Sequence, residues 1–355
     1  MSDADAEILA EKRGRLGHIT LNRPRAINAL THPMIKRLTQ TLVEWASDDD
    51  VQTVVITGAG ERGLCAGGDI VALYDAAKSQ DIEAAAGFWA DEYRLNAYIA
   101  GYPKPYVAIM DGVTLGGGVG ISAHGSHRVV TERSTVGMPE TGIGFIPDVG
   151  GSWLLSRAPG ELGVYLALTA KPMSGADAIA TGFADRFVPS DRLPALLEAL
   201  EATPADEAIA AVATEPPTSD LVAQQGWIDE AFSADTVANV VKRLRDIATE
   251  ESIAAAETVS IKSPIALSVA FESLRRAREL ETLEHALEQE FRVSLHALQH
   301  RDFAEGVRAQ VIDKDRRPKW KPDRVEDLNK EDIDEFFEPV DDLTLGLVEQ
   351  QQQRG

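Results

Sequence analysis

Three glycine-rich stretches set the fold of this 355-residue chain. They read CAGGDI at residues 65–70, LGGGVG at residues 115–120 and MPETGIGFIPDVGG at residues 138–151. The first two stand where a loop is expected to pass into a helix, and glycine lets the backbone approach a ligand closely there. Free N–H groups at helix starts bind developing negative charge, and two of them converging on one oxygen form an oxyanion hole. The third stretch adds carboxylates to a loop rich in proline and glycine.

The segments around these stretches alternate between strand and helix patterns. Residues 51–57 and residues 105–110 are short apolar runs, which predict buried strands. Thr31 is expected to cap a helix that runs to about Ser47, with Pro33 in its first turn. Because this alternation continues through most of the N-terminal half, the chain is expected to have an α/β architecture.

The composition describes a globular protein with excess acid. The chain has 57 acidic and 35 basic side chains, a net charge of −22, which argues against nucleic acid or an anionic membrane as partner. Apolar runs stay short of the roughly 20 residues that span a bilayer. Cys65 is the single cysteine, which excludes an intramolecular disulfide and fits a reducing compartment. Since the acidic N-terminus also lacks the basic pattern of a targeting peptide, a cytoplasmic location is expected.

The excess acid is concentrated away from the glycine-rich stretches. Residues 201–260 carry 3 basic and 12 acidic side chains, and residues 323–355 carry 3 and 11. We therefore expect four consecutive parts. They are a core at 1–200, an acidic helical connector at 201–260, a helical region at 261–325 and an acidic, flexible tail at 326–355.

Other familiar motifs fail on their context. Gly58–Gly63 matches GxGxxG, but the third glycine leads into another glycine-rich stretch and not into a helix, so a dinucleotide site is disfavoured. His296 and His300 lie four apart on an expected helix without the carboxylate pattern of a metal site, which favours packing or surface histidines. Cys65 lacks a Cys–His signature, so it is expected to pack and not to act as a nucleophile. Neither a metal nor a cofactor is therefore expected.

In order, the three stretches, together with LNRP at residues 21–24 and NAL at residues 28–30, resemble the crotonase (enoyl-CoA hydratase/isomerase) superfamily. Within it the chain is most similar to the 3-hydroxyisobutyryl-CoA hydrolases, on residues 92–96, residues 104–106 and a run from 302 to 320. The resemblance implies a crotonase-type spiral of ββα repeats with a helical C-terminal region. It also implies an acyl-CoA thioester substrate and, by analogy with relatives, a homo-oligomer such as a trimer or hexamer.

The resemblance also assigns roles to residues of the three stretches. The N–H groups of Gly68 and Gly117 would form the oxyanion hole for the thioester carbonyl. The first glutamate of hydratases falls at Gly120, which has no side chain, whereas the second matches Glu140. A further carboxylate, Asp148, stands where hydratases commonly have glycine. Because general acid–base catalysis contributes about 10²–10⁴-fold per group, a chain without the first glutamate is expected to be a poor hydratase.

The carboxylates that remain suit thioester hydrolysis. Glu140 is expected to attack the thioester carbonyl or to activate a water molecule that does so. Asp148 is expected to assist hydrolysis or orient the substrate, and Glu92, by resemblance, to hold the substrate's 3-hydroxyl group. The residues expected along the CoA moiety are Arg25, Ala26, Ala66, Asp69 and Ile70. Trp320 stands among basic residues, which suggests adenine stacking but favours structural packing more strongly.

The expected activity is hydrolysis of a short-chain acyl-CoA thioester, above all 3-hydroxyisobutyryl-CoA, as in valine catabolism. Coenzyme A would enter as part of the substrate, with no separate cofactor. Two alternatives stay open at this point. One is an enoyl-CoA hydratase or isomerase that retains Glu140 as its base, and the other is a non-catalytic CoA-binding protein.

Overall fold

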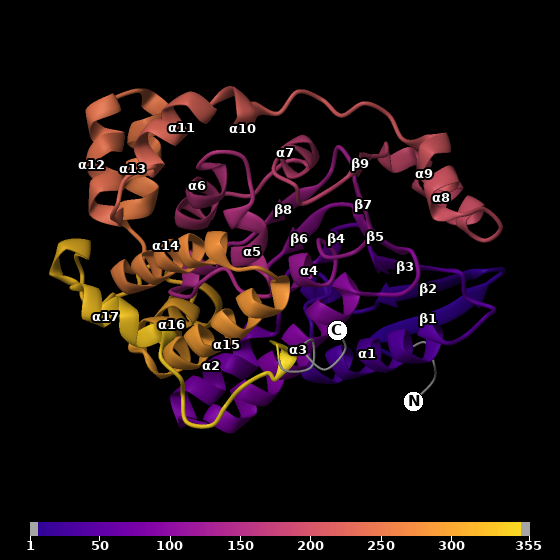
Figure 1. The fold of residues 1–355 in the computed structure, drawn as a ribbon, viewed down its shortest axis with the longest axis horizontal. Helices are drawn as coiled ribbons and strands as arrows, with labels where there is room; N and C mark the ends of the chain where they lie inside the picture. The colour runs from indigo at the N-terminus through magenta and orange to yellow at the C-terminus, as the bar shows by residue number, and fades with distance from the viewer. Residues whose placement is uncertain (1–5, 349–355) are drawn as a thin grey trace. The chain divides into compact units, whose positions relative to one another are not determined.

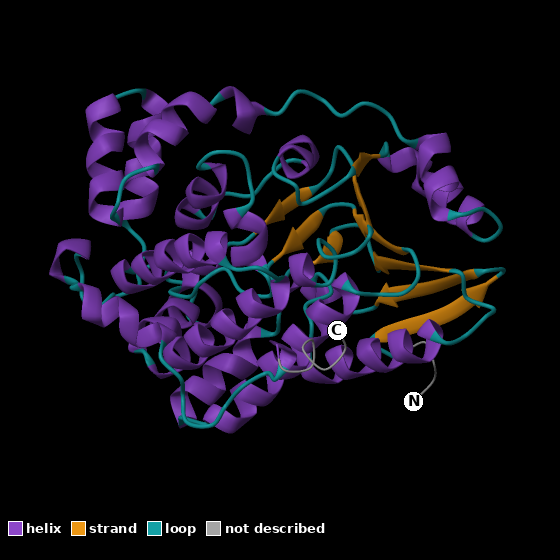
Figure 2. Ribbon diagram, viewed as in Figure 1, coloured by secondary structure: helices purple, strands orange, loops and turns teal. Residues whose placement is uncertain are grey.

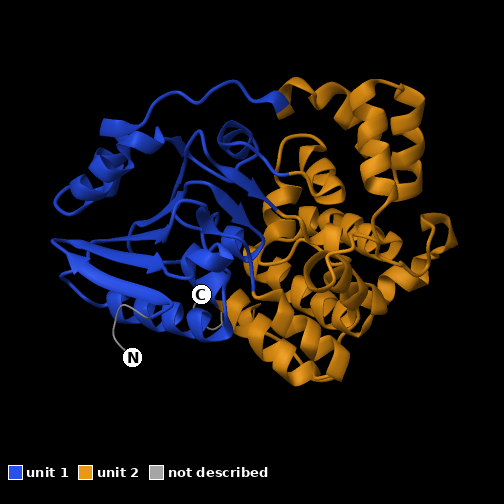
Figure 3. Cartoon of the chain, turned by 180° about the vertical axis from the view of Figure 1, so that it is seen from behind, with its two compact units in different colours: residues 1–68, 95–137, 172–220 blue, residues 69–94, 138–171, 221–355 orange. Residues whose placement is uncertain are grey.

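The computed structural model describes residues 6–348. The chain forms two compact units, each assembled from three separate stretches of sequence (Figure 3). Unit 1 comprises residues 1–68, 95–137 and 172–220, and unit 2 comprises residues 69–94, 138–171 and 221–355. The units therefore alternate along the chain, while the expected division into four consecutive domains stays a prediction.

Unit 1 contains a six-stranded sheet in which only the first pair of strands is antiparallel (Figures 1 and 2). The strands lie in the order β1 (Ile8–Arg13), β2 (Leu16–Leu21), β3 (Thr53–Gly58), β5 (Tyr106–Met110), β7 (His127–Val130) and β9 (Arg186–Phe187). The predicted strands at 51–57 and 105–110 are thus confirmed. All five residues of β5 are buried, as expected for a parallel strand covered on both faces.

A second, smaller sheet carries the first two glycine-rich stretches. Its parallel strands are β4 (Gly63–Cys65), β6 (Val113–Leu115) and β8 (Thr135–Gly137), of three residues each. The helix α4 (Gly117–Gly120) follows β6 and starts at the glycine where a helix was predicted. A Cβ atom on Gly118 would lie 2.5 Å from the Cys65 carbonyl oxygen, so glycine allows α4 to pack against β4.

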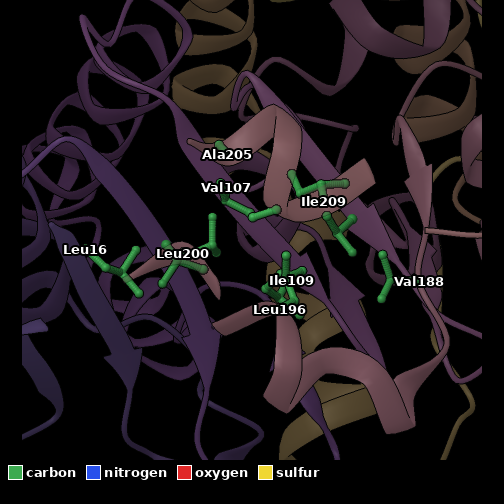
Figure 4. Close-up of a cluster of buried hydrophobic side chains, with 11 residues drawn as sticks. Leu16, Val107, Ile109, Val188, Leu196, Leu200, Ala205 and Ile209 are labelled. Atoms are coloured by element: carbon green, nitrogen blue, oxygen red, sulfur yellow. The ribbon is translucent and has the colours of Figure 1, made fainter. Parts of the chain in front are cut away.

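Helices cover the large sheet of unit 1. The side chain of Thr31 accepts a hydrogen bond from the Met34 amide and caps α1 (His32–Ala46), as predicted. On one face, α8 (Leu193–Leu200) and α9 (Ala205–Val212) pack on the sheet through a buried cluster (Figure 4). Its members include Leu16, Val55, Val107, Ile109, Val188, Leu196, Leu200 and Ile209. In unit 1 α7 (Gly175–Ala180) packs near β7, β8 and β9.

Unit 2 is helical. Its elements are α2 (Ile70–Ser79), α3 (Ile82–Ala100, in this unit up to Arg94), α5 (Gly151–Ser156), α6 (Leu162–Thr169), α10 (Asp220–Ala223), α11 (Gln225–Phe232), α12 (Val237–Ile247), α13 (Glu250–Ser260), α14 (Pro264–Glu279), α15 (Leu283–Gln299), α16 (Arg301–Val307) and α17 (Lys330–Asp334). Among residues 6–348, no single helix is long and apolar enough to cross a membrane, although α13 and α14 pass that test as a pair bent by 111°.

The acidic segment after residue 326, expected to be a flexible tail, is packed over its described part. Phe336 and Phe337 are each 8% exposed, and Leu345 is 1% exposed. The Arg94 guanidinium donates hydrogen bonds to the Leu345 carbonyl, and the Glu288 carboxylate accepts them from the amides of Leu345 and Leu347. The expectation is corrected for 326–348, because apolar anchors outweigh the solvation of the acids between them. Residues 349–355, with the glutamine run, lie outside the described residues.

Candidate active site

The third glycine-rich stretch is held in place by α16. The loop contains a short 3-10 helix, Glu140–Ile143, which ends at Gly144 with φ of +72°. A Cβ atom on Gly144 would lie 2.5 Å from the Asp302 carbonyl oxygen, and one on Gly306 would lie 2.1 Å from the Ile143 carbonyl oxygen. The backbones of loop and helix therefore touch directly, and both positions require glycine.

Aromatic packing joins this loop to the helix that carries Glu92. The ring of Phe145 stacks on Trp89 of α3 at 5.6 Å between centroids and meets Phe303 of α16 at 5.3 Å. One turn further along α3, Tyr93 packs edge-on against Phe291 of α15. Aromatic side chains bury large areas with defined geometry, so these contacts fix α3, the loop and α15 as one framework.

The structure brings the three predicted carboxylates into one buried cluster of unit 2. Glu92 is 2% exposed, Glu140 7% and Asp148 6%. Burial, followed by the charge of Asp148, raises the pKa of both Glu92 and Glu140 well above the usual value of a glutamate. Carboxylates that raise one another's pKa in a buried cluster are a recognised sign of a functional site.

Two carboxylate oxygens of this cluster are without hydrogen-bond partners among the described residues. They are Oε1 of Glu92 and Oε2 of Glu140, both fully enclosed. A buried polar atom that makes no hydrogen bond costs free energy, so native proteins keep few of them. The hydrogen-bonding capacity of these two oxygens is therefore not used by the described residues.

Asp148 is in a different environment. The hydroxyl of Tyr93 donates a 2.7 Å hydrogen bond to Oδ2 of Asp148, and Ser294 lies 2.9 Å from the same hydroxyl. Since the one phenolic proton is directed to Asp148, Ser294 is the donor to Tyr93. Burial raises the pKa of Asp148 to about 7, and the Tyr93 hydrogen bond opposes the rise. Asp148 can therefore exchange a proton near neutral pH.

The sequence analysis missed Glu290 and Ser294. Both lie on α15, about 140 residues after the loop, and Glu290 is fully buried. Its carboxylate accepts hydrogen bonds from the Gly150 amide at 2.7 Å and the Ser152 amide at 2.9 Å. The sequence did contain a signal that their side chains are buried. Both residues fall at helical spacing in the apolar stripe that includes Leu283 and Leu287.

In unit 1 the two glycine stretches of the predicted oxyanion hole lie side by side. A Cβ atom on Gly67, which has φ of +116°, would lie 3.4 Å from the Leu115 carbonyl oxygen and 3.8 Å from the Gly117 nitrogen. Gly117 is the first residue of α4, so its N–H group is not used by the helix's own ladder. Gly68, which follows β4 in the chain, forms an isolated β-bridge with Leu30.

Three of the residues expected along CoA also come together in unit 1. Arg25 and Ala26 are exposed on a 3-10 turn, and the Ala66 amide donates a 2.9 Å hydrogen bond to the Ile27 carbonyl that follows this turn. Arg62, which the sequence analysis missed, donates hydrogen bonds to the carbonyls of Pro24 and Arg25 at 2.5 and 2.7 Å. It adds a second positive charge beside the turn.

The other two expected CoA residues, Asp69 and Ile70, belong to unit 2. Asp69 precedes α2 and Ile70 is its first residue, and both are half-buried. Trp320 donates a 2.8 Å hydrogen bond from its indole nitrogen to the Ile261 carbonyl, and its ring borders a cavity of about 750 Å³.

His296 and His300, which the sequence analysis did not favour as metal ligands, make contacts within the fold. His296 lies 3.0 Å from the Glu338 carbonyl oxygen, and the His300 side chain accepts a hydrogen bond from the Asp302 amide at the start of α16. Within residues 6–348, no group of three or more His, Cys, Asp or Glu side chains has an arrangement that could hold a metal ion.

A family model described as enoyl-CoA hydratase/isomerase matches residues 16–337. The chain belongs to this family. The curated 3-hydroxyisobutyryl-CoA hydrolase, mitochondrial, of Mus musculus is 41% identical over 94% of this chain and 89% of its own length. The protein of that name from Danio rerio is 39% identical over 98% of this chain and 93% of its own length. The resemblance to these hydrolases is thus confirmed.

Solved structures of the family agree closely with the fold. One, named a carnitinyl-CoA dehydratase from Mycobacterium thermoresistibile, has a TM-score of 0.93 and 51% identity, over 96% of this chain and 98% of its own. Another, named an enoyl-CoA hydratase from Rhodobacter sphaeroides, has a TM-score of 0.91 and 40% identity, over 96% and 99%. The expected α/β crotonase fold with a helical C-terminal region is confirmed.

The expected cytoplasmic location is contradicted. The curated relatives from Danio rerio, Mus musculus and Homo sapiens are all named mitochondrial and not cytoplasmic. The composition gave no warning, because excess acid and one buried cysteine fit any reducing compartment equally well.

Proposed function

We propose that this protein hydrolyses 3-hydroxyisobutyryl-CoA to 3-hydroxyisobutyrate and CoA. The observation that carries the proposal is the unequal environment of two carboxylates on one loop. Glu140 has an enclosed oxygen without a partner among the described residues, whereas Asp148 accepts a hydrogen bond from Tyr93. We assign the attack to the carboxylate whose oxygen lacks a protein partner, and the proton transfer to the carboxylate that Tyr93 holds in a fixed orientation.

The chemistry follows from these two environments. Glu140 attacks the thioester carbonyl carbon, or removes a proton from a water molecule that attacks it, and a carbon–oxygen bond forms. Negative charge develops on the carbonyl oxygen. By family resemblance, we propose that the N–H groups of Gly68 and Gly117 stabilise this charge. The carbon–sulfur bond then breaks, and the departing thiolate takes a proton from Asp148, whose pKa of about 7 suits that transfer. If Glu140 attacked, a water molecule then cleaves the resulting anhydride, which frees the acid and Glu140 and returns a proton to Asp148. If water attacked, the acid is already formed, and the proton held by Glu140 passes to Asp148.

Glu92 is the residue that we propose for acyl recognition. Its enclosed Oε1 has no partner among residues 6–348, and burial, followed by the charge of Asp148, raises its pKa well above the usual value of a glutamate, which favours the neutral carboxyl. A neutral carboxyl both donates and accepts, which is what a substrate hydroxyl group requires. This supports a 3-hydroxyacyl substrate over an unsubstituted one, because a site built for a hydroxyl leaves buried polar atoms unpaired without it.

We propose that the CoA moiety lies along Arg25, Ala26 and Ala66, with Asp69 and Ile70 as further contacts. The positive charges of Arg25 and Arg62 beside one turn support this, since CoA carries negative phosphates. Thioester hydrolysis by carboxylates and amides balances with water alone, so the proposal includes neither a cofactor nor a metal. Assembly into a trimer or hexamer stays a prediction that light scattering tests.

A second candidate is addition or removal of water at an acyl-CoA double bond. The 51% identity to a protein named a carnitinyl-CoA dehydratase favours it. Against it stands Gly120, buried in α4 and without a side chain, where hydratases are expected to have their first glutamate. Of the two glutamates that hydratases use, this chain would keep only Glu140, which would then have to serve as both acid and base.

The deciding experiment follows thiol release with a thiol reagent from a panel of short acyl-CoA esters. We expect rapid release from 3-hydroxyisobutyryl-CoA, slower release from esters without the hydroxyl, and loss of release in Glu140→Gln. Hydration of crotonyl-CoA without thiol release would refute the proposal in favour of the second candidate. Binding of acyl-CoA with neither reaction would leave a non-catalytic CoA-binding protein.

A further inference from the structure

The helix α15 holds the turn that directly follows Asp148. The carboxylate of Glu290 accepts three hydrogen bonds there: from the Gly150 amide at 2.7 Å, from the Ser152 amide at 2.9 Å and from the Ser152 hydroxyl at 2.5 Å. All four participating groups are buried within unit 2. Glu290 thus binds the backbone on the C-terminal side of Asp148 from a helix about 140 residues away in sequence.

The turn that Glu290 holds is strained. Val149 has φ of +52° and Gly150 has φ of +80°. A β-branched residue in the left-handed region is a genuine outlier, and such conformations persist only where the surroundings enforce them. They cluster at functional sites, and this one lies next to Asp148. Three hydrogen bonds to one carboxylate supply the enforcement.

The same helix also reaches Asp148 from its side-chain end. Ser294 lies one turn after Glu290 on α15 and contacts the Tyr93 hydroxyl, which in turn donates to Asp148. Residues four apart on a helix share one face. One face of α15 therefore fixes Asp148 twice, through its carboxylate and through the backbone that follows it.

We propose that Glu290 is a positioning residue for the hydrolysis, which holds the strained turn at residues 149–152 so that Asp148 keeps its working orientation. Burial raises the pKa of Glu290 to about 8, and the hydrogen bonds from Ser152 and Gly150 oppose that rise, so these contacts favour a carboxylate acceptor at this position. The inference rests on the proposed function, because the step that Glu290 would support is the proton transfer from Asp148.

The principal test is the kinetics of Glu290→Gln. Glutamine keeps the size of the side chain but replaces one acceptor oxygen with an NH₂ group, which cannot accept from an amide. We expect kcat for thiol release to fall about 10- to 100-fold, the scale of a small misplacement of a catalytic group, while KM changes less than about 3-fold. Ser152→Ala is the milder variant, which removes one of the three hydrogen bonds, and should lower kcat about 3- to 10-fold.

Glu288→Gln is the matched control. Glu288 lies on the same helix, is also buried at 8% exposed, and also accepts from amides, those of Leu345 and Leu347 in the C-terminal segment. We expect its kcat to stay within about 2-fold of the wild type, whatever its melting temperature, because its hydrogen bonds hold the C-terminal segment and not the turn after Asp148. Equal losses of kcat in both variants would show a structural role and overturn the inference.

The wild-type protein is assayed first, which separates the two proposals. Absence of thiol release in the wild type refutes the proposed function, and the role of Glu290 falls with it. Release by the wild type together with unchanged kcat in both Glu290→Gln and Ser152→Ala overturns the inference alone. A graded loss, larger in Glu290→Gln than in Ser152→Ala and absent in Glu288→Gln, supports it.

Discussion

The hydroxyl of Tyr93 donates a 2.7 Å hydrogen bond to Oδ2 of Asp148, and this bond joins α3 to the loop at residues 138–151. Burial raises the pKa of Asp148 to about 7, and the Tyr93 bond, which favours the ionised carboxylate, keeps it from rising further. The hydrogen bond from Tyr93 therefore lowers the pKa of Asp148, the residue that we propose as the proton donor.

Replacing Tyr93 with phenylalanine should move the pH profile upward. Without the hydrogen bond the ionised form of Asp148 is less stable, so the pKa of Asp148 rises above about 7. A proton donor works while it is protonated, so the alkaline limb of kcat for thiol release should shift to higher pH. Steady-state kinetics across the pH range measure this, and a limb that stays in place or moves down would contradict the assignment.

Asp148→Asn should retain binding and lose turnover. The amide is of equal size, so the loop can keep its conformation, but it cannot donate an acidic proton to the leaving thiolate. General acid–base groups contribute about 10²–10⁴-fold, and we expect kcat to fall by that factor with the dissociation constant of the acyl-CoA little changed. Stopped-flow thiol release and calorimetry measure the two quantities. Unchanged turnover would remove Asp148 from the mechanism.

Gly306→Ala should damage both stability and activity, because its Cβ atom would lie 2.1 Å from the Ile143 carbonyl oxygen in the loop at residues 138–151. Overpacking of this kind costs about 1–3 kcal/mol or more, and here the strain falls on the loop that carries Glu140. Gly87→Ala is the control: nothing lies within 4 Å of its added Cβ atom, and alanine favours the helix by about 0.5–1 kcal/mol. Thermal unfolding compares them, and equal melting temperatures would contradict the packing.

Leu345→Ala tests whether the C-terminal segment is packed. Leu345 is 1% exposed, and truncating a buried leucine to alanine costs about 2–5 kcal/mol. A flexible tail would show no change in the free energy of unfolding. Val43→Ala, at a side chain 53% exposed, is the matched surface change and should stay within about 0.5 kcal/mol of the wild type. Chemical denaturation of both variants gives the comparison.

Local signals in the sequence predicted what depends on neighbouring residues. Buried strands at β3 and β5, the Thr31 cap and the helix start at Gly117 all follow from apolar runs, capping chemistry or glycine. In the small sheet, β8 was predicted as a strand at 135–138, whereas β4 and β6 were not predicted, because three residues are too few to show a period.

The sequence by itself determined the family and the α/β class. It also determined the residue types of the three glycine-rich stretches, including the glycine at position 120, which has no side chain. Only the tertiary structure decided the chemical state of those residues. The pKa of Asp148 depends on burial and on Tyr93, and the turn after it depends on Glu290, from a helix far along the chain. Desolvation and hydrogen bonding act through space, so no local pattern carries them.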